Sequence, residues 1–296
     1  MPYARRDMRD RICLVTGANA GIGRATAEAL SALGAHVVLV CRSPERGRDA
    51  QREIQASTGN PWVNLLLADL SSIAEVRALA DAFRTDYGRL DVLVNNAAAI
   101  FPKRRLSRDG IEMNLALNHL AYFTLTNLLF EPLRQAEDGR VVNVSAEAHR
   151  GATFDLDDHF HEDRYHPVEL YMQAKLANVM FTFEAARRFA GTNVSVNCLH
   201  PGVVQTRALD EIRAVAREVY GSASSSPGSP PDEGAQGPVY LATAAELSGV
   251  SGHYFVDLCP TRASEPSYNQ EAARRLWELS AELTGVPTLQ LPLPAA

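Results

Sequence analysis

The stretch RICLVTGANAGIGRATAEAL, residues 11–30, decides the fold of this 296-residue chain. It begins as a short apolar run, turns through three glycines, and continues with apolar residues at helical spacing. Gly17 allows a sharp turn, Gly21 lets the backbone approach a ligand, and Gly23 lets the helix pack closely on the strand. The first N–H groups of a helix have no intrahelical acceptor and attract a diphosphate. This unit therefore predicts a dinucleotide site, with a plain turn as the alternative.

Strand-like and helical segments keep alternating after this unit. Apolar, strand-like runs, most of them separated by helical sequence, recur at residues 36–42, 62–70, 90–98, 139–146, 193–202 and 252–258. Parallel strands joined by helices are covered on both faces, so runs this apolar favour βαβ units. Crossover connections between such strands are right-handed. We therefore predict an α/β fold, a Rossmann-type doubly wound parallel sheet of about seven strands with helices on both faces.

One segment interrupts this alternation. Residues 220–238, YGSASSSPGSPPDEGAQGP, are rich in serine, proline and glycine, a composition that cannot build a core. A linker between two domains is the alternative, but too little chain follows it for a second domain. We predict a single dinucleotide-binding domain over residues 1–296, with a mobile loop at about 206–238.

The composition excludes several classes of protein. Apolar residues make up 46% and charged residues 22%, as in soluble globular proteins rather than disordered ones. The formal charge of −6 repels nucleic acids and anionic lipids, so we predict no nucleic-acid partner. The charged start MPYARRDMRDR lacks the apolar region of a signal peptide, and no run of 18 apolar residues occurs. We expect a soluble cytoplasmic protein without a membrane anchor.

Cysteines and histidines do not indicate a metal site. Four cysteines without CxxC spacing occur at Cys13, Cys41, Cys198 and Cys259. They resemble small buried side chains in a reducing compartment more than disulfides or metal ligands. Four histidines crowd an acidic segment, at His149, His159, His161 and His166. Histidines and carboxylates can bind metals, but tight ligand spacing such as HExxH is missing, so we interpret the segment as a solvated surface and predict no metal.

The second strand indicates which dinucleotide binds. An NAD site usually has an acidic residue at the end of this strand to bind the ribose 2′-OH. Here the strand ends in Cys41 and Arg42. A guanidinium can hold a 2′-phosphate through charge-assisted hydrogen bonds, so Arg42 favours NADP(H). A solvated surface arginine is the alternative, because Arg46 and Arg48 follow closely.

Four polar residues lie where the carboxyl edge of such a sheet places its chemistry. Ser145 ends a predicted strand, and Asn118 lies in a long, otherwise largely apolar helical stretch, LALNHLAYFTLTNLL. Tyr171 and Lys175 are four residues apart in YMQAK, hence on one face of a helix. Each residue alone has an ordinary structural explanation, as a cap, a packing residue or a surface pair. Their combination with the glycine turn indicates catalysis.

In these motifs the sequence resembles the short-chain dehydrogenase/reductase family, and within it the retinol dehydrogenase-like branch. The matching motifs, in the family's order, are TGANAGIG (16–23), DL (69–70), NNAA (95–98), Asn118, Ser145, YMQAK (171–175) and HPGVVQT (200–206). The 25 residues between Ser145 and Tyr171 also fit that branch. Two features depart from it: Ala98 stands where the family commonly has glycine, and the branch's apolar N-terminal anchor is missing.

The resemblance implies roles for the four polar residues. Tyr171 is the expected acid in reduction and base in oxidation. Lys175 and the positive nicotinamide are expected to lower its pKa from about 10, and Lys175 to bind the nicotinamide ribose. Ser145 is expected to hold the substrate oxygen, and Asn118 to support Lys175 through a water-linked proton relay.

The resemblance also implies the cofactor contacts. They are Gly17, Asn19, Ala20, Gly21, Ile22, Gly23, Arg42, Asp69, Leu70, Asn96, Ala97, Tyr171, Lys175, Pro201, Gly202, Val204 and Thr206. Asp69 and Leu70 are expected at the adenine, Asn96 and Ala97 at the adenosine ribose, and Thr206 at the nicotinamide carboxamide.

The segments beyond the strand ends are expected to form the substrate pocket. Their apolar side chains are Phe101, Phe154, Leu209, Ile212, Val215 and Val219. They favour a bulky hydrophobic carbonyl compound or secondary alcohol under a mobile lid. We predict an NADP(H)-dependent oxidoreductase that acts as a ketone reductase in secondary metabolism.

Three alternatives remain open at this point. Two belong to the same family: a retinal or aldehyde reductase, and an NAD-dependent alcohol dehydrogenase. The third is a non-catalytic, dinucleotide-binding regulatory protein. The resemblance also allows a homodimer through the helices that contain Asn118 and Tyr171, because both helices are apolar.

Overall fold

The computed structural model describes residues 3–153 and 165–287. They form one eight-stranded sheet with the strand order β3-β2-β1-β4-β5-β6-β7-β8. The first seven strands run parallel, and the order reverses direction between β1 and β4. The predicted doubly wound α/β fold is therefore confirmed.

The strands are β1 (Ile12–Thr16), β2 (His36–Cys41), β3 (Val63–Leu67), β4 (Val92–Asn95), β5 (Gly139–Val144), β6 (Val194–His200), β7 (Tyr254–Val256) and β8 (Cys259–Pro260). The α-helices are α1 (Gly21–Ala32), α2 (Pro44–Thr58), α3 (Ile73–Asp86), α4 (Met113–Leu115), α5 (Ala121–Leu128), α6 (Phe130–Arg134), α7 (Pro167–Arg188), α8 (Arg207–Tyr220), α9 (Pro231–Gly234), α10 (Gln236–Thr243) and α11 (Gln270–Thr284). A π-helix, η1 (Ala116–Leu120), joins α4 to α5, and 3-10 turns form η2 (Glu147–Gly151), η3 (Ala245–Leu247) and η4 (Glu265–Tyr268).

The sheet has one strand more than the seven expected. β8 pairs antiparallel with β7 across a tight turn in which Asp257 and Leu258 have φ of 48° and 64°. A strand of two residues that contains a proline has no periodic pattern, so the sequence did not indicate it.

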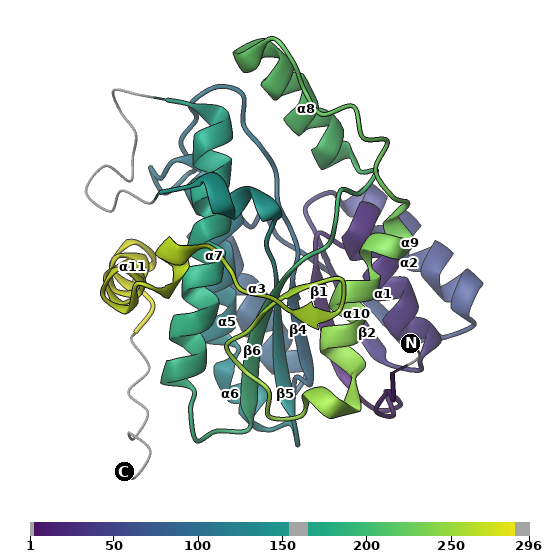
Figure 1. The fold of residues 1–296 in the computed structure, drawn as a ribbon. Coiled ribbons are helices and arrows are strands. Elements are labelled where there is room, and N and C mark those ends of the chain that lie inside the picture. The colour runs from purple at the N-terminus through teal and green to yellow at the C-terminus, as the bar shows by residue number, and fades with distance from the viewer. Residues whose placement is uncertain (1–2, 154–164, 288–296) are drawn as a thin grey trace.

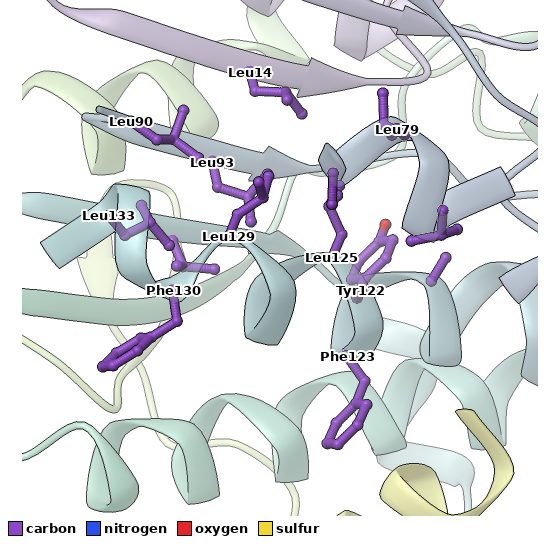
Figure 2. Packing of buried hydrophobic residues seen from close by; sticks show 14 of the residues in the cluster. Leu14, Leu79, Leu90, Leu93, Tyr122, Phe123, Leu125, Leu129, Phe130 and Leu133 are labelled. Atoms are coloured by element: carbon purple, nitrogen blue, oxygen red, sulfur yellow. The ribbon is translucent and has the colours of Figure 1, made fainter. Parts of the chain in front are cut away.

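Alternate strand residues point into two separate cores, as the pleat requires. Leu14 and Leu93 pack with α3, α5 and α7 on one face, where Tyr122 and Phe130 complete the cluster (Figure 2). Cys13, Val15 and their neighbours pack with α1, α2 and α10 on the other face. Burial on both faces explains why the strands are almost uniformly apolar.

The segment expected as a loop at about 206–238 is largely helical. Residues 207–220 form α8, which stands at the top of the molecule in Figure 1. Thr206 accepts the Leu209 N–H at the start of α8, and Gly221 ends the helix with φ of 71°. Residues 221–230 form no helix, and α9 and α10 follow. The secondary structure of residues 206–238 thus corrects the prediction that this segment is a loop.

Three of the four cysteines are buried, in agreement with the interpretation from the sequence, whereas Cys259 is exposed on β8. Within residues 3–153 and 165–287, no helix has the length and apolar character needed to span a membrane.

Candidate active site

The glycine turn joins β1 to α1 with the close packing that its spacing predicts. Gly17 has φ of 67° and Gly21 has φ of 54°, a region that side chains other than glycine disfavour. A Cβ on Gly23 would lie 2.5 Å from the Gly17 carbonyl oxygen and 2.4 Å from Asn96 Nδ2. The N-cap residue of α1 is Ala20, which has no side-chain acceptor for the first N–H groups of the helix. These donors are therefore available to an anion.

Two expected cofactor segments lie against this turn. Asn96 donates from Nδ2 to the Thr16 carbonyl oxygen at 2.8 Å, and the Ala97 N–H donates to Thr16 Oγ1 at 3.0 Å. On the other side, a Cβ on Gly21 would lie 2.9 Å from Thr206 Cγ2. The structure thus brings the segments around Asn96 and Thr206 to the two sides of the glycine turn.

The remaining members of this set surround the same region. Asn19, Gly21, Ile22, Pro201 and Gly202 are partly exposed, and Ala20 is exposed. Val204 is buried beside Ile22, because both side chains approach Gly234 of α9. Ala98 has no positive φ, so the backbone at this position does not require the glycine usual in the family.

Arg42 follows β2 at the same edge of the sheet and is exposed. No acidic partner of its guanidinium occurs in the part of the chain that the structure describes, and the same holds for Arg46 and Arg48. Arg52, farther along α2, pairs with Asp49 at 2.5 Å. Glu45, in the first turn of α2, is the one carboxylate among these three arginines, so the end of β2 and the start of α2 keep a net positive charge, which suits a phosphate group.

Asp69 and Leu70 follow β3; Asp69 is partly exposed and Leu70 is buried. Asp69 Oδ1 accepts the backbone N–H and the hydroxyl of Ser71 at 3.0 and 2.7 Å. The Leu70 side chain is buried in the core beside α3. Any contact of Leu70 with an adenine would involve its backbone rather than its side chain.

Ser145, Tyr171 and Lys175 meet at the carboxyl end of β5. Ser145 Oγ donates to the Lys175 carbonyl oxygen at 2.9 Å, and Lys175 Nζ donates to the Val144 carbonyl oxygen at 3.0 Å. Lys175 Nζ lies 5.7 Å from the ring centroid of Tyr171 and 5.7 Å from that of Tyr122. Lys175 is 1% exposed and faces carbonyl and aromatic groups rather than a carboxylate.

Burial controls the protonation of this pair. It lowers the pKa of Lys175 to about 7 and raises the pKa of Tyr171 to about 12. We expected Lys175 to lower the pKa of Tyr171. Without a bound dinucleotide, burial outweighs this effect of Lys175 and raises the pKa of Tyr171 instead of lowering it.

Asn118 lies in the π-helix η1, within the stretch that the sequence suggested as one long helix. Its side-chain amide pairs with Ala99: Oδ1 accepts the Ala99 N–H at 2.9 Å and Nδ2 donates to the Ala99 carbonyl oxygen at 2.9 Å. Its own carbonyl oxygen accepts Asn178 Nδ2 at 2.8 Å. Asn118 therefore links the segment after β4 to the helix that carries Tyr171 and Lys175.

Sequence reasoning missed three residues of this region. The ring of Tyr122 lies beside the Lys175 amino group, but its position in an apolar helical stretch did not mark it as part of the site. Asn178 lies three residues after Lys175, so its helical spacing could have indicated it. His149, expected on a solvated surface, is fully buried: Nδ1–H donates to the Ala146 carbonyl oxygen at 2.8 Å and Nε2 accepts the Ser264 N–H at 3.1 Å.

The other residues of that histidine-rich segment are only partly described. His166 caps α7 by accepting the Glu169 N–H at 3.3 Å, and His159 and His161 lie outside the described residues. Among the described residues, no group of three or more His, Cys, Asp or Glu side chains is arranged to hold a metal ion.

Four of the six candidate substrate residues lie on α8. Leu209, Ile212 and Val215 occupy one side of this helix and are partly or fully buried, whereas Val219 is 37% exposed. Tyr220, at the end of α8, lies with its ring centroid 5.5 Å from that of His166 at the start of α7. Phe101 is partly buried, and its carbonyl oxygen accepts the Tyr165 hydroxyl. Phe154 lies outside the described residues.

Comparisons with known proteins agree with this geometry. The family model for short chain dehydrogenases matches residues 11–216. The chain belongs to the short-chain dehydrogenase family. Human retinol dehydrogenase 13 is 38% identical over 290 residues, which cover 95% of this chain and 87% of the relative. This similarity makes the short-chain dehydrogenase described here retinol dehydrogenase-like.

Two solved structures extend the comparison. An uncharacterised protein from Mycobacterium paratuberculosis superposes with a TM-score of 0.77 at 31% identity, over 96% of this chain and 97% of that chain. A protein from Beutenbergia cavernae, named as an NAD(P)-dependent gluconate 5-dehydrogenase and solved with NADP at low occupancy, gives a TM-score of 0.66 at 28% identity. That match covers 84% of this chain and 95% of the other.

Proposed function

We propose that this short-chain dehydrogenase uses NADPH to reduce the carbonyl group of a bulky, apolar compound, with a ketone as the first expected substrate. The observation that carries the proposal is the contact of Ser145 with Lys175 after β5, together with the Tyr171 ring beside the Lys175 amino group. The strand order reverses between β1 and β4, the strand next to β5, and the glycine turn follows β1. In open α/β sheets ligands bind at such a switch point.

The residues present fit a dinucleotide. The turn leaves no room for a Cβ at Gly23 and has a φ of 67° at Gly17 that disfavours one, and the first N–H groups of α1 have no capping side chain. Asn19, Ala20 and Ile22 are accessible beside this turn, with Asn96 and Thr206 on its two sides. A bound reduced nicotinamide supplies the hydride that is added to the carbonyl carbon.

The protein supplies the proton and the polar contacts. Hydride addition leaves negative charge on the substrate oxygen, and the Tyr171 hydroxyl donates its proton there. The high pKa of Tyr171 keeps this hydroxyl protonated at neutral pH. Ser145 Oγ can turn from the Lys175 carbonyl oxygen to donate to the substrate oxygen. Lys175, once charged, lowers the cost of the tyrosinate that remains.

The preference for NADPH rests on Arg42. Its exposed guanidinium follows β2, where a 2′-phosphate would lie, and Arg46 and Arg48 add positive charge nearby. The NADP-bound relative supports this choice by analogy. Three buried free cysteines are in keeping with a reducing, cytoplasmic setting in which NADPH is available.

The substrate class rests on the apolar side of α8. Leu209, Ile212 and Val215 would face an apolar substituent of the substrate. The similarity to retinol dehydrogenase 13 favours a second candidate, reduction of an apolar aldehyde such as retinal, at the same residues. Both candidates use the same chemistry and differ in one substituent on the carbonyl carbon.

The decisive experiment follows NADPH absorbance with a panel of apolar ketones and aldehydes, and repeats it with NADH. We expect turnover with NADPH, and a loss of about 10- to 100-fold in kcat/KM for NADPH in Arg42→Ala. The NADH rate of that variant should be unchanged, and Arg52→Ala, farther along α2 and already paired with Asp49, is the control. Equal use of both cofactors by the unaltered protein would refute the role of Arg42. Tight NADPH binding without turnover of any compound would instead favour a regulatory protein.

A further inference from the structure

A buried chain of hydrogen bonds connects the catalytic helix to two other elements. Asn178 of α7 donates from Nδ2 to the Asn118 carbonyl oxygen at 2.8 Å, and its Oδ1 lies 3.3 Å from His119 Nδ1. His119 Nε2 lies 3.0 Å from Ser280 Oγ of α11. Asn178, Asn118 and His119 are 0% exposed, and Ser280 is 1% exposed.

The direction of each hydrogen bond follows from the partners. Asn178 must present Nδ2 to the Asn118 carbonyl oxygen, so its Oδ1 faces His119. His119 Nδ1 must then carry the proton, so Nε2 can only accept. The Ser280 hydroxyl has one proton, which it gives either to this nitrogen at 3.0 Å or to the Leu276 carbonyl oxygen at 2.7 Å. Burial lowers the pKa of His119 to about 4, so the ring is neutral at neutral pH and keeps this arrangement.

The Asn118 carbonyl oxygen belongs to a π-helical turn. The Ala121 N–H bonds to the Ala116 carbonyl oxygen five residues earlier, which widens the turn around Asn118. Inserted turns of this kind are frequent at functional sites. The side chain of Asn118 meanwhile holds both backbone groups of Ala99, two residues after Ala97. The chain of contacts thus runs from α11 through α7 and η1 to the segment beside the glycine turn.

We propose that Asn178 and His119 are positioning residues that set the distance between the catalytic helix and the cofactor segment after β4. This proposal rests on the proposed function. Lys175 lies one turn before Asn178 on α7, so a shift of Asn178 against Asn118 moves Tyr171 and Lys175 relative to the segment 96–99. Through Ser280, α11 would be part of this support, although it lies outside the residues 11–216 that the family model matches.

The test compares Asn178→Leu and His119→Phe with Asn127→Leu. Asn127, on α5, is equally a buried asparagine, but its Nδ2 donates to the Phe123 carbonyl oxygen at 2.8 Å, away from this chain of contacts. Single-turnover reduction with NADPH is measured well below each variant's melting temperature. Hydrogen exchange at the Ala99 amide, which bonds to Asn118, is measured without substrate.

Displacement of reacting groups by an ångström costs up to about 100-fold, so Asn178→Leu and His119→Phe should slow the single turnover by about 10- to 100-fold. Their dissociation constants for NADPH should stay within about threefold, since the glycine turn is untouched. The Ala99 amide should exchange faster in both variants. His119→Gln, which can still donate to Asn178, should recover most of the rate, and Asn127→Leu should match the unaltered protein in both measurements.

Ser280→Ala is the milder variant should the others fail to fold. It should slow turnover and speed exchange at Ala99 to a smaller extent. Unchanged exchange at Ala99 in every variant would overturn the proposal, as would equal rate losses in His119→Gln, His119→Phe and Asn127→Leu. The exchange measurement needs no turnover. If the protein reduces none of the compounds but Asn178→Leu and His119→Phe still speed exchange at Ala99, the proposed reaction fails while the contact chain from His119 to Ala99 is supported.

Discussion

Lys175 holds its amino group among the Val144 carbonyl oxygen and the rings of Tyr122 and Tyr171, without a carboxylate partner in the described chain. A buried ammonium without an opposite charge is costly, so its pKa falls to about 7. Proton release from this amino group is therefore brought close to neutral pH. Charge on this side chain thus responds to small changes in its surroundings, as a proton-transfer site requires.

Substitution of the two catalytic side chains should separate chemistry from binding. Tyr171→Phe removes the acid, so kcat should fall by about 100- to 10,000-fold, while the NADPH dissociation constant measured by fluorescence titration stays nearly constant. Lys175→Ala should impair both, because its amino group serves the ribose and the tyrosine. Tyr268→Phe, at an exposed ring, is the control. Full activity of Tyr171→Phe would exclude this residue as the proton donor.

The low pKa of Lys175 also predicts how stability varies with pH. Between pH 7 and 10.5 the unfolded chain binds a proton at this lysine that the folded protein releases, so stability rises with pH. The penalty is fully present below pH 7. Relative to Lys175→Met, the free energy of unfolding in urea should rise by up to about 1.4 kcal/mol per pH unit between pH 7 and 9. Identical pH dependence of the two proteins would contradict the shift.

At the level of elements, α8 lies in a segment whose two ends are joined by backbone hydrogen bonds. The Gln205 N–H donates to the Ser229 carbonyl oxygen and the Ser229 N–H to the Val203 carbonyl oxygen, both at 2.8 Å. Gly228, with φ of 78°, fits beside these groups. Only Val215 of α8 is fully buried. A helix joined at one base and thinly packed can move as a unit, so mobility of this lid stays a prediction of the sequence that the geometry permits.

A substitution on each side of α8 tests its role at the substrate. Ile212→Asn places an amide on the partly buried apolar side, and should raise KM for an apolar carbonyl compound about 10-fold by the loss of apolar contact. Ala214→Asn, on the exposed side of the same helix, is the matched control. Urea unfolding of both variants should be nearly unchanged. Equal KM values in the two variants would remove α8 from the substrate pocket.

At the scale of the whole molecule, α11 covers the helices through which the resemblance allowed a dimer. It packs on α5 and α7 and is seen almost end-on beside α7 in Figure 1. Trp277 of α11 lies with its ring centroid 5.0 Å from that of Phe123 on α5 and 5.7 Å from that of Phe181 on α7. The apolar faces that could have formed an interface are thus used within the chain.

This coverage predicts a monomer. Two copies could pair through α5 and α7 only by displacing α11 and exposing Trp277, which is 2% exposed. Size-exclusion chromatography with light scattering should give the mass of one chain across a wide concentration range. A stable dimer with hydrogen-exchange protection on α5 and α7 would contradict this prediction, whereas protection elsewhere would locate a different interface.

The sequence predicted the parallel strands because burial on both faces requires continuous apolar runs. It missed the helix α8, although Leu209, Ile212, Val215 and Val219 have helical spacing, because the serine- and proline-rich stretch that follows them dominated the interpretation. It missed the π-helix because an inserted residue leaves the apolar pattern of a helix almost unchanged.

The sequence by itself determined the alternation of strands and helices, the glycine turn, and the spacing of Tyr171 and Lys175 on one helical face. These features are local, so a few neighbouring residues contain them. Only the tertiary structure decided which groups face Lys175, that Asn118 links Ala99 to Asn178, and that α11 covers α5 and α7. Hydrogen-bond partners and burial depend on residues far apart in the chain, and burial in turn determines the pKa directions at the catalytic pair.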